Sequence, residues 1–283
     1  MLLSKALKHL KLIVFDLDGT LLNDEGKIGE ETKYLVRELK KSGVRFSFAS
    51  GRVHSAMVKF TEELDVNMPF ISLDGALIKN SKDSTVVYQS FLKKSHVLKC
   101  IRLSEQYLVN FVLCHAEAIY FTEAHNIIPQ ITDKFGALYK EVSSYDNYLD
   151  ETLEVFFAGS NRQSVAYLRD RLSFPFTIGC SSSFYRSSSQ ESVYYLEIRK
   201  GGSTKGKALK RLLKYLNIQE KETAVLGDWY NDIPMFQTNT FKVAVSNAVA
   251  ELKRNADYVT KRSNNEDAAS EFLNLVLKYK KGN

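Results

Sequence analysis

Three aspartates follow short apolar runs of the sequence that are typical of buried strands. Side chains just after such strands can take part in chemistry, because they lie at the edge of a parallel sheet. Asp16 and Asp18 come directly after Leu12–Phe15, and Asp228 follows a second apolar run at 223–226. Two carboxylates ~4 Å apart at an effective dielectric of ~20 repel each other by about 4 kcal/mol, and a divalent cation relieves that repulsion. Because Mg²⁺ takes a few carboxylates and fills its other positions with water or phosphate oxygens, these residues predict a magnesium site.

A lysine at a predicted helix start adds a second kind of site. Lys205 follows Gly201 and Gly202 and precedes Gly206. Its positive charge and the backbone N–H groups of a helix N-terminus both attract phosphate. We therefore expect an anion site at this helix start.

Strands and helices alternate in the two outer parts of the chain. The first part predicts strands at 12–15, 44–49 and 70–73 and helices at 30–42 and 55–64. The last part predicts helices at 205–216 and 232–238 and strands at 223–226 and 241–245. Ligands of an open α/β sheet bind beyond the carboxyl ends of its strands, so we expect Asp16, Asp18, Ser50 and Asp228 to converge there. The predicted fold class is α/β, with a Rossmann-like parallel-sheet core.

The middle of the chain has a different pattern. It predicts strands at 86–89, 110–113, 119–121, 153–158 and 194–198, mixed with helices at 95–107 and 162–172. We therefore predict a core formed by residues 1–84 and 197–283 and an inserted α+β domain at 85–196. Within the insertion, 181–192 holds seven serines. This composition favours a flexible loop, with a loop that touches the substrate as the alternative.

Four short motifs, in this order, resemble those of the haloacid dehalogenase superfamily. They are FDLDGTL at 15–21, ASGR at 49–52, KG at 205–206 and GDWYND at 227–232. Within the superfamily the chain is similar to the Cof-type phosphatases of subfamily IIB. That similarity rests on DGA at 74–76, YLEI at 195–198, VAVSNA at 243–248 and NED at 265–267. The resemblance implies that the insertion is a C2-type cap domain, which closes over the site and selects substrates.

The resemblance also implies catalytic roles. Asp16 would be the nucleophile that forms a phosphoryl-aspartate, which divides one difficult hydrolysis into two displacements. Asp18 would protonate the leaving oxygen and then take a proton from the attacking water. Ser50 would hydrogen-bond a phosphoryl oxygen, and Lys205 would neutralise charge on the transferring group.

The metal ligands implied by the resemblance are Asp16, the main-chain carbonyl of Asp18, Asp228 and Asn231. Asp232 would orient Lys205 rather than bind the metal itself. Asp74 stands where the subgroup often has Asn. A backbone role in the Asp-Gly turn is as plausible there as a contact with substrate, so Asp74 is left out of the predicted catalytic set.

The predicted function is that of a Mg²⁺-dependent hydrolase of phosphoric monoester bonds. Its substrates would be small phosphomonoesters, either sugar phosphates or phosphorylated cofactors such as flavin mononucleotide and pyridoxal phosphate. Two alternatives stay open: a phosphosugar mutase of similar architecture, and a non-catalytic module that binds a phosphorylated metabolite. A need for a bisphosphate activator would indicate the mutase, and Mg²⁺ binding without turnover would indicate the module.

The composition of the chain limits which binding partners and which cellular compartment we expect. Lys and Arg outnumber Asp and Glu by 39 to 33, and this net charge of +6 is spread too thinly to predict a nucleic acid partner. Three cysteines without CxxC spacing disfavour a disulfide framework or a zinc site. No apolar run is long enough to cross a membrane, and the first residues lack the apolar core of a signal peptide. We expect a cytoplasmic protein without a membrane partner, either a monomer or a small homo-oligomer.

Overall fold

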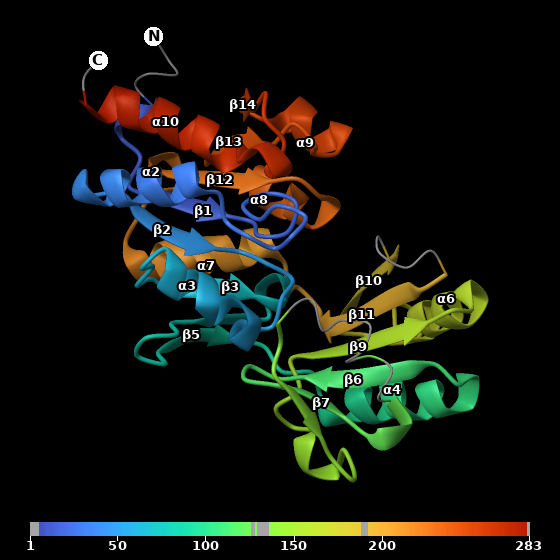
Figure 1. Cartoon of the computed structure of the whole chain (residues 1–283). Coiled ribbons are helices and arrows are strands. Elements are labelled where there is room, and N and C mark those ends of the chain that lie inside the picture. Colours follow the sequence, from blue (N-terminus) through green and yellow to red (C-terminus); the bar gives the residue numbers. More distant parts are fainter. Residues whose placement is uncertain (1–5, 126–127, 129–135, 188–191, 282–283) are drawn as a thin grey trace. The chain divides into compact units, whose positions relative to one another are not determined.

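A computed structural model describes residues 6–125, 128, 136–187 and 192–281, which divide into two compact units (Figure 1). The core unit lies within 1–51, 58–88 and 204–283, and the inserted unit lies within 52–57 and 89–203. The chain passes between the units a few residues later than the sequence suggested, and 52–57 also belongs to the inserted unit. None of the helices in these described ranges is long and apolar enough to span a membrane.

The core unit contains a five-stranded parallel sheet in the order β14-β13-β12-β1-β2. Its strands are β1 (Leu12–Phe15), β2 (Arg45–Phe48), β12 (Thr223–Gly227), β13 (Phe241–Ala244) and β14 (Tyr258–Val259). All four residues of β1 are apolar and buried, as expected for a central strand that is covered on both faces. Phe15 pairs with Leu226 on one side and Phe48 on the other, so three strands end at the same edge. The predicted parallel-sheet core is confirmed.

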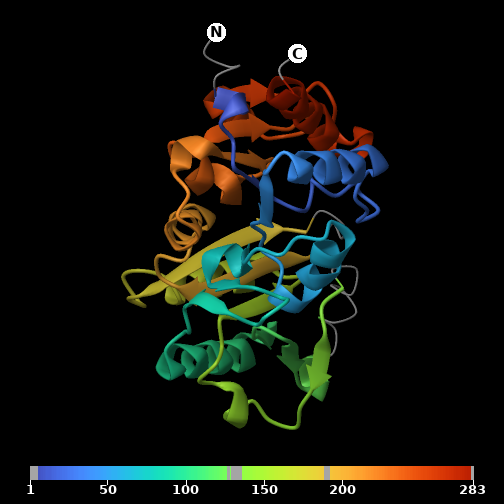
Figure 2. The same cartoon turned by 90° about the vertical axis from the view of Figure 1, so that its left-hand side faces the viewer.

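Helices with one apolar side pack on this sheet. Leu209 and Leu212 lie three positions apart in α7, which places them on one side of the helix, and they pack with Val14 and Val225 of the sheet. Helices α2 and α10 lie side by side (Figure 2). The α-helices of this unit include α2 (Glu30–Lys41), α3 (Val58–Glu63), α7 (Lys205–Leu216), α8 (Ile233–Phe236), α9 (Ala250–Asn255) and α10 (Ala268–Lys281).

A small sheet in the order β3-β4-β5 also belongs to the core unit. Its strands are β3 (Phe70–Ser72), β4 (Leu77–Lys79) and β5 (Val86–Gln89). The sequence placed a strand at 70–73 in the alternating core, but β3 pairs antiparallel with β4. Its backbone joins the parallel sheet through a parallel bridge between Ala49 and Ile71. The tight turn at 73–75 sends the chain straight back, and this is why β3 and β4 form a hairpin.

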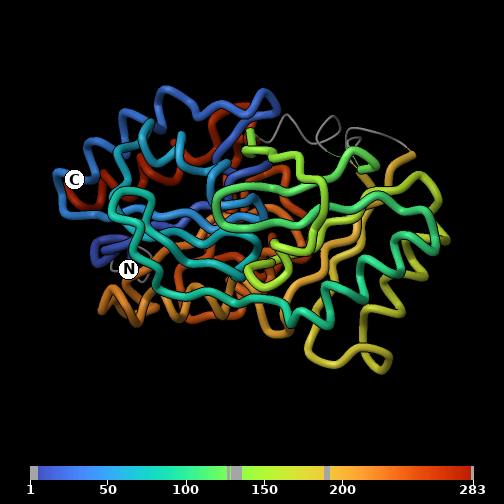
Figure 3. Tube along the Cα trace, turned by 90° about the horizontal axis from the view of Figure 1, so that it is seen from below, coloured from blue at the N-terminus to red at the C-terminus, as the bar shows by residue number. Residues whose placement is uncertain are grey.

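The inserted unit contains a six-stranded mixed sheet in the order β10-β11-β9-β6-β7-β8. Its strands are β6 (Asn110–Cys114), β7 (Ile119–Phe121), β8 (Tyr139–Glu141), β9 (Glu154–Gly159), β10 (Cys180–Arg186) and β11 (Tyr194–Lys200). Helices α4 (Lys94–Tyr107) and α6 (Arg162–Arg171) run next to each other (Figure 3). Their apolar residues Val97 and Leu168 pack with Phe157 of the sheet, so both helices cover the same face.

Part of the serine-rich stretch 181–192 is a strand, which corrects the prediction of a flexible loop. Cys180–Arg186 forms β10 and pairs antiparallel with β11 along its whole length. Phe184 stacks on Tyr194 with ring centroids 6.0 Å apart, and the Tyr185 hydroxyl donates to Glu197 at 2.6 Å. These contacts with a neighbouring strand stabilise a segment whose serines have little strand preference of their own. Residues 188–191 lie outside the described residues.

Candidate functional site

Asp16 lies one residue beyond the central strand of the core. Its backbone N–H donates to the carbonyl of Leu226 at 3.0 Å, which extends the pairing of β1 with β12 past the end of the strand. The residue is only 5% exposed. The strand therefore fixes the Asp16 carboxyl group at the edge where three strands end.

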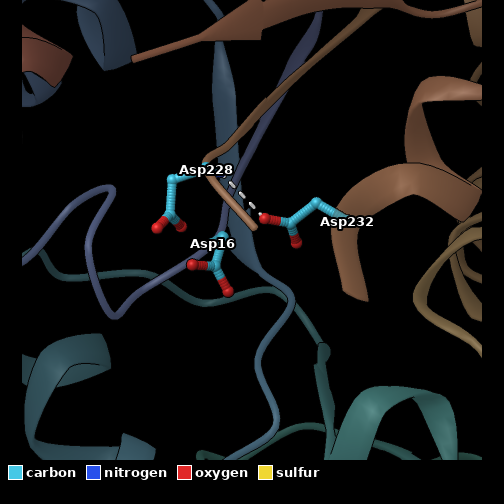
Figure 4. A group of neighbouring side chains, drawn as sticks. All are labelled: Asp16, Asp228 and Asp232. Carbon is cyan, nitrogen blue, oxygen red and sulfur yellow. Dashed lines mark hydrogen bonds between the residues drawn. The ribbon is translucent and has the colours of Figure 1, made fainter. Parts of the chain in front are cut away.

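Three buried carboxyl groups meet at this edge. Oxygens of Asp16, Asp228 and Asp232 lie within 4.8 Å of one another, and Figure 4 shows the three groups side by side. Asp228 follows β12, and Asp232 lies one short turn further along the chain. Carboxylates this close and this buried need a compensating positive charge.

Lys205 supplies one positive charge from the start of α7. Its side chain is fully buried, and its Nζ donates to Oδ1 of Asp16 at 2.5 Å and to Oδ1 of Asp232 at 2.7 Å. Thr204 caps the helix by accepting a hydrogen bond from the Lys207 N–H. The lysine is thus held between the predicted nucleophile and the residue that was predicted to orient it.

Asp232 is committed to donors from the protein itself. While Oδ1 accepts from Lys205, Oδ2 accepts from the backbone N–H groups of Asp228 at 3.0 Å and Trp229 at 3.2 Å. Figure 4 shows the bond between Asp228 and Asp232 as a dashed line. These contacts suit a residue that shapes the loop and fixes the lysine more than one that binds a metal directly.

Asp228 is held by the turn that follows Asp16. The Thr20 hydroxyl donates to Oδ1 of Asp228 at 2.9 Å. Gly19 has a φ of +77°, and a Cβ added there would lie 2.4 Å from Oδ2 of Asp228. A side chain at position 19 would therefore be strained and would displace the carboxylate, which explains the glycine of this motif.

Burial and like charges shift the acidities of this group. Burial and the nearby charge of Asp232 raise the pKa of Asp16 well above its ordinary value and raise the pKa of Asp228 to about 7. Burial alone would lower the pKa of Lys205, but the carboxylates of Asp16, Asp232 and Asp74 together raise it. The lysine therefore stays protonated and positively charged. Because the buried carboxylates repel one another, binding of a further cation near them is favourable.

The donor atoms of the site fit a hard divalent cation. Asp16 and Asp228 present carboxylate oxygens within 4.8 Å of each other. Asn231, three residues after Asp228, is half-buried and adds an amide oxygen. Oxygen ligands of this kind suit Mg²⁺ and not a soft metal.

Two further predicted site residues take different positions. The Asp18 side chain is exposed and stands outside the buried carboxylate group, while its backbone forms a bridge with Leu22. Ser50 is buried, and its N–H donates to the carbonyl of Ile71 at 3.0 Å. The roles predicted for Asp18 and Ser50 stay predictions.

Asp74 belongs to the surroundings of Lys205, although the sequence argument left it out. The residue is 6% exposed, and its Oδ1 lies 4.0 Å from Nζ of Lys205 and accepts from Nδ2 of Asn231 at 3.1 Å. The signal in the sequence was an acidic residue directly after a predicted strand. Thr20 was also missed, because a threonine in a turn carries no sign of the carboxylate that it will bind.

Comparison with known proteins identifies the family of the chain. A model of the haloacid dehalogenase-like hydrolase family matches residues 13–273. The phosphatase YwpJ of Bacillus subtilis is 28% identical, covering 95% of this chain and 100% of its own length. The 5-amino-6-(5-phospho-D-ribitylamino)uracil phosphatase YitU of the same bacterium is 26% identical, covering 93% and 96%.

Solved structures share the fold. A haloacid dehalogenase-like hydrolase from Bacteroides thetaiotaomicron has a TM-score of 0.83 at 23% identity, covering 94% of this chain and 99% of its own. TM0651 from Thermotoga maritima has a TM-score of 0.79 at 25% identity, covering 94% and 97%. The resemblance drawn from the four motifs is confirmed: the chain belongs to the family of haloacid dehalogenase-like hydrolases.

Proposed function

We propose that this protein is a Mg²⁺-dependent phosphatase that hydrolyses small phosphomonoesters through a phosphoryl-aspartate at Asp16. The observation that carries the proposal is the buried Asp16 carboxyl group, bonded to Lys205 and grouped with Asp228 at the carboxyl ends of the strands. The relatives YwpJ and YitU, both named as phosphatases, support the same class of reaction.

The proposed reaction has two displacements. A carboxylate oxygen of Asp16 attacks phosphorus, the ester P–O bond breaks, and Asp18 gives its proton to the leaving oxygen. Water then attacks the phosphoryl-aspartate while Asp18 takes a proton from it, which releases inorganic phosphate and restores both carboxyl groups. The exposed position of the Asp18 side chain suits a group that exchanges protons with water and with a leaving alcohol.

The other residues of the site bind and balance charge. Lys205 would stabilise the charge on the transferring phosphoryl group, and Ser50 would hydrogen-bond one of its oxygens. Asp16, Asp228, Asn231 and the main-chain carbonyl of Asp18 would hold Mg²⁺, which when bound supplies the positive charge that these carboxylates and a phosphate require.

The substrate class follows from the chemistry of the site and from its relatives. Sugar phosphates and phosphorylated cofactors such as flavin mononucleotide and pyridoxal phosphate are the proposed substrates. The name of YitU adds a phosphorylated ribitylamino-uracil to the compounds worth testing. We propose that the inserted unit selects among them. The cytoplasmic location and the monomeric or small oligomeric state stay predictions from the sequence.

The test is phosphate release from a panel of phosphomonoesters, with Mg²⁺ and with EDTA. Wild type should release phosphate only with the metal, and Asp16→Asn should release none, because an amide is a poor nucleophile. The matched control is Asp150→Asn, which should keep full activity. Asp150 belongs to the inserted unit, and its side chain is 76% exposed. Wild-type rates in Asp16→Asn would overturn the mechanism. Conversion of a phosphosugar into its isomer that depends on an added bisphosphate, without phosphate release, would indicate the mutase instead.

A further inference from the structure

The turn between β3 and β4 has an unusual backbone. Leu73, Asp74 and Gly75 have φ values of +48°, +47° and +101°, so three consecutive residues are left-handed. Glycine adopts this region freely and aspartate tolerates it, whereas a leucine there is strained. Such a turn persists only where its surroundings hold it, and strained backbone of this kind gathers at functional sites.

Contacts within the core unit hold the turn in place. The Asp74 N–H donates to the carbonyl of Ser50 at 3.0 Å. A Cβ added to Gly75 would lie 2.6 Å from the carbonyl oxygen of Thr204, the residue that caps α7. The turn is therefore packed between the second motif and the start of the helix that carries Lys205.

The strain places the Asp74 carboxylate against two residues of the proposed site. Oδ1 accepts from Nδ2 of Asn231 at 3.1 Å and lies 4.0 Å from Nζ of Lys205. An ionised carboxylate can only accept hydrogen bonds, so the NH₂ end of Asn231 must face Asp74. This contact leaves the amide oxygen of Asn231, the atom through which an amide binds Mg²⁺, as the available ligand atom.

We propose that Asp74 is a positioning residue, which fixes the Asn231 amide with its oxygen as the metal ligand and shares the charge of Lys205. The proposal rests on the proposed function and its magnesium site. An asparagine at position 74 would offer a donor and an acceptor, and so would let the Asn231 amide sit in either orientation. An aspartate at position 74 permits one orientation of the Asn231 amide only.

The experiment is calorimetric titration of Mg²⁺ into the metal-free full chain. Asp74→Asn should weaken Mg²⁺ binding by a few-fold, and Asp74→Ala should weaken it by about 10- to 100-fold, the range found when a partner that orients a metal ligand is lost. Asp65→Asn is the matched control. Asp65 is also left-handed at +48° and accepts a hydrogen bond from a lysine, but its side chain is 75% exposed. It should bind Mg²⁺ as wild type does.

A double-mutant cycle tests whether Asp74 acts through Asn231. In the background of Asn231→Ala, replacing Asp74 should no longer change the affinity for Mg²⁺. An equal loss in both backgrounds would overturn the proposal, and so would wild-type affinity in both Asp74 variants. If Asp74→Ala does not fold, the cycle is run with Asp74→Asn, which keeps the shape of the side chain.

Failure of the inference and failure of the proposed function can be told apart, because metal affinity is measured without turnover. A wild-type chain that binds Mg²⁺ but hydrolyses no phosphomonoester would remove the function and leave the comparison of affinities intact. Full hydrolysis together with unchanged affinity in the Asp74 variants would keep the function and remove the inference. Wild type that binds no Mg²⁺ would remove both the metal role and the inference.

Discussion

Nζ of Lys205 donates a hydrogen bond to Oδ1 of Asp16 at 2.5 Å, although the two residues stand 189 positions apart and neither is more than 5% exposed. The pair joins the end of β1 to the start of α7. Because Asp232 binds the same ammonium group from the other side, the lysine sits between two carboxylates. The buried pair thus connects the stability of the core with the chemistry of its proposed nucleophile.

Removing this lysine should cost stability as well as activity. Lys205→Met leaves Asp16 and Asp232 buried without their cation, and breaking a buried pair in this way costs about 3–5 kcal/mol in the free energy of unfolding. Urea unfolding with phosphate release measures both effects. Lys210→Met, on the same helix but 58% exposed, is the control and should change the free energy of unfolding by less than about 1 kcal/mol. A similarly small change for Lys205→Met would contradict the ion pair.

Asp18→Asn should discriminate between leaving groups. An ester such as p-nitrophenyl phosphate has a leaving group that needs no proton, whereas an alkyl phosphate needs one from the general acid. Single-turnover rates should therefore fall at least about tenfold more for the alkyl ester. Asp16→Asn, as the control, should abolish turnover of both. Equal losses for the two esters in Asp18→Asn would remove the acid role.

Stabilisation by Mg²⁺ should increase with pH. Burial and Asp232 raise the pKa of Asp228 to about 7 without a cation, so the folded chain holds this proton more tightly than the unfolded chain does. The contribution of this group to stability is full below its unfolded pKa and is lost as the pH rises through about 7. Mg²⁺ replaces the proton, so the Mg²⁺-induced rise in Tm should be larger at about pH 8 than at about pH 5.5.

Asp228→Asn provides the control for this pH dependence. The amide of this variant cannot ionise. Mg²⁺ should therefore raise the Tm of the variant less than that of wild type, and this rise should depend less on pH. A rise in the wild-type Tm that is independent of pH, or larger at the acidic value, would contradict the assignment of Asp228 as a metal ligand.

Gly19→Ala should damage the site through Asp228. The added Cβ would lie 2.4 Å from Oδ2 of that carboxylate, on a backbone with a φ of +77°. We expect kcat to fall by about tenfold or more together with weaker Mg²⁺ binding, because a metal ligand is displaced. Gly26→Ala is matched in backbone strain, with a φ of +72°, but no atom lies within 4 Å of its added Cβ. It should lose about 1 kcal/mol of stability and keep its activity. Equal activity in the two variants would refute the steric argument.

The sequence predicted the elements whose local pattern and tertiary surroundings agree. A continuous apolar run gave β1, and regular helical spacing gave α2 and α7 to within a residue of their bounds. Because the motif aspartates directly follow strands of one parallel sheet, the convergence of Asp16 and Asp228 could also be predicted. In each case the secondary structure that the local sequence prefers is the one that its tertiary contacts also stabilise.

What could not be predicted depends on contacts between distant segments. Strand β10 is serine-rich, and its pairing with β11 overrides that local composition. The position of the Asp74 carboxylate depends on a left-handed turn that packs against Thr204. Neither the pairing partner nor the packing partner leaves a trace in the segment itself. Sequence pattern alone therefore favoured a loop in one case, and in the other could not decide between a backbone role and a contact with substrate.

The most direct test of the central claim is to capture the phosphoryl group on Asp16. The protein is mixed with radiolabelled phosphomonoester and Mg²⁺, quenched in acid within the first turnover, digested, and analysed by mass spectrometry. A labelled peptide that contains Asp16, loses its label to hydroxylamine and is absent from Asp16→Asn is the predicted result. With an ester whose leaving group needs no proton, label should build up further in Asp18→Asn, because the water is no longer activated. Hydrolysis without any label on the protein, or label on another residue, would contradict the account.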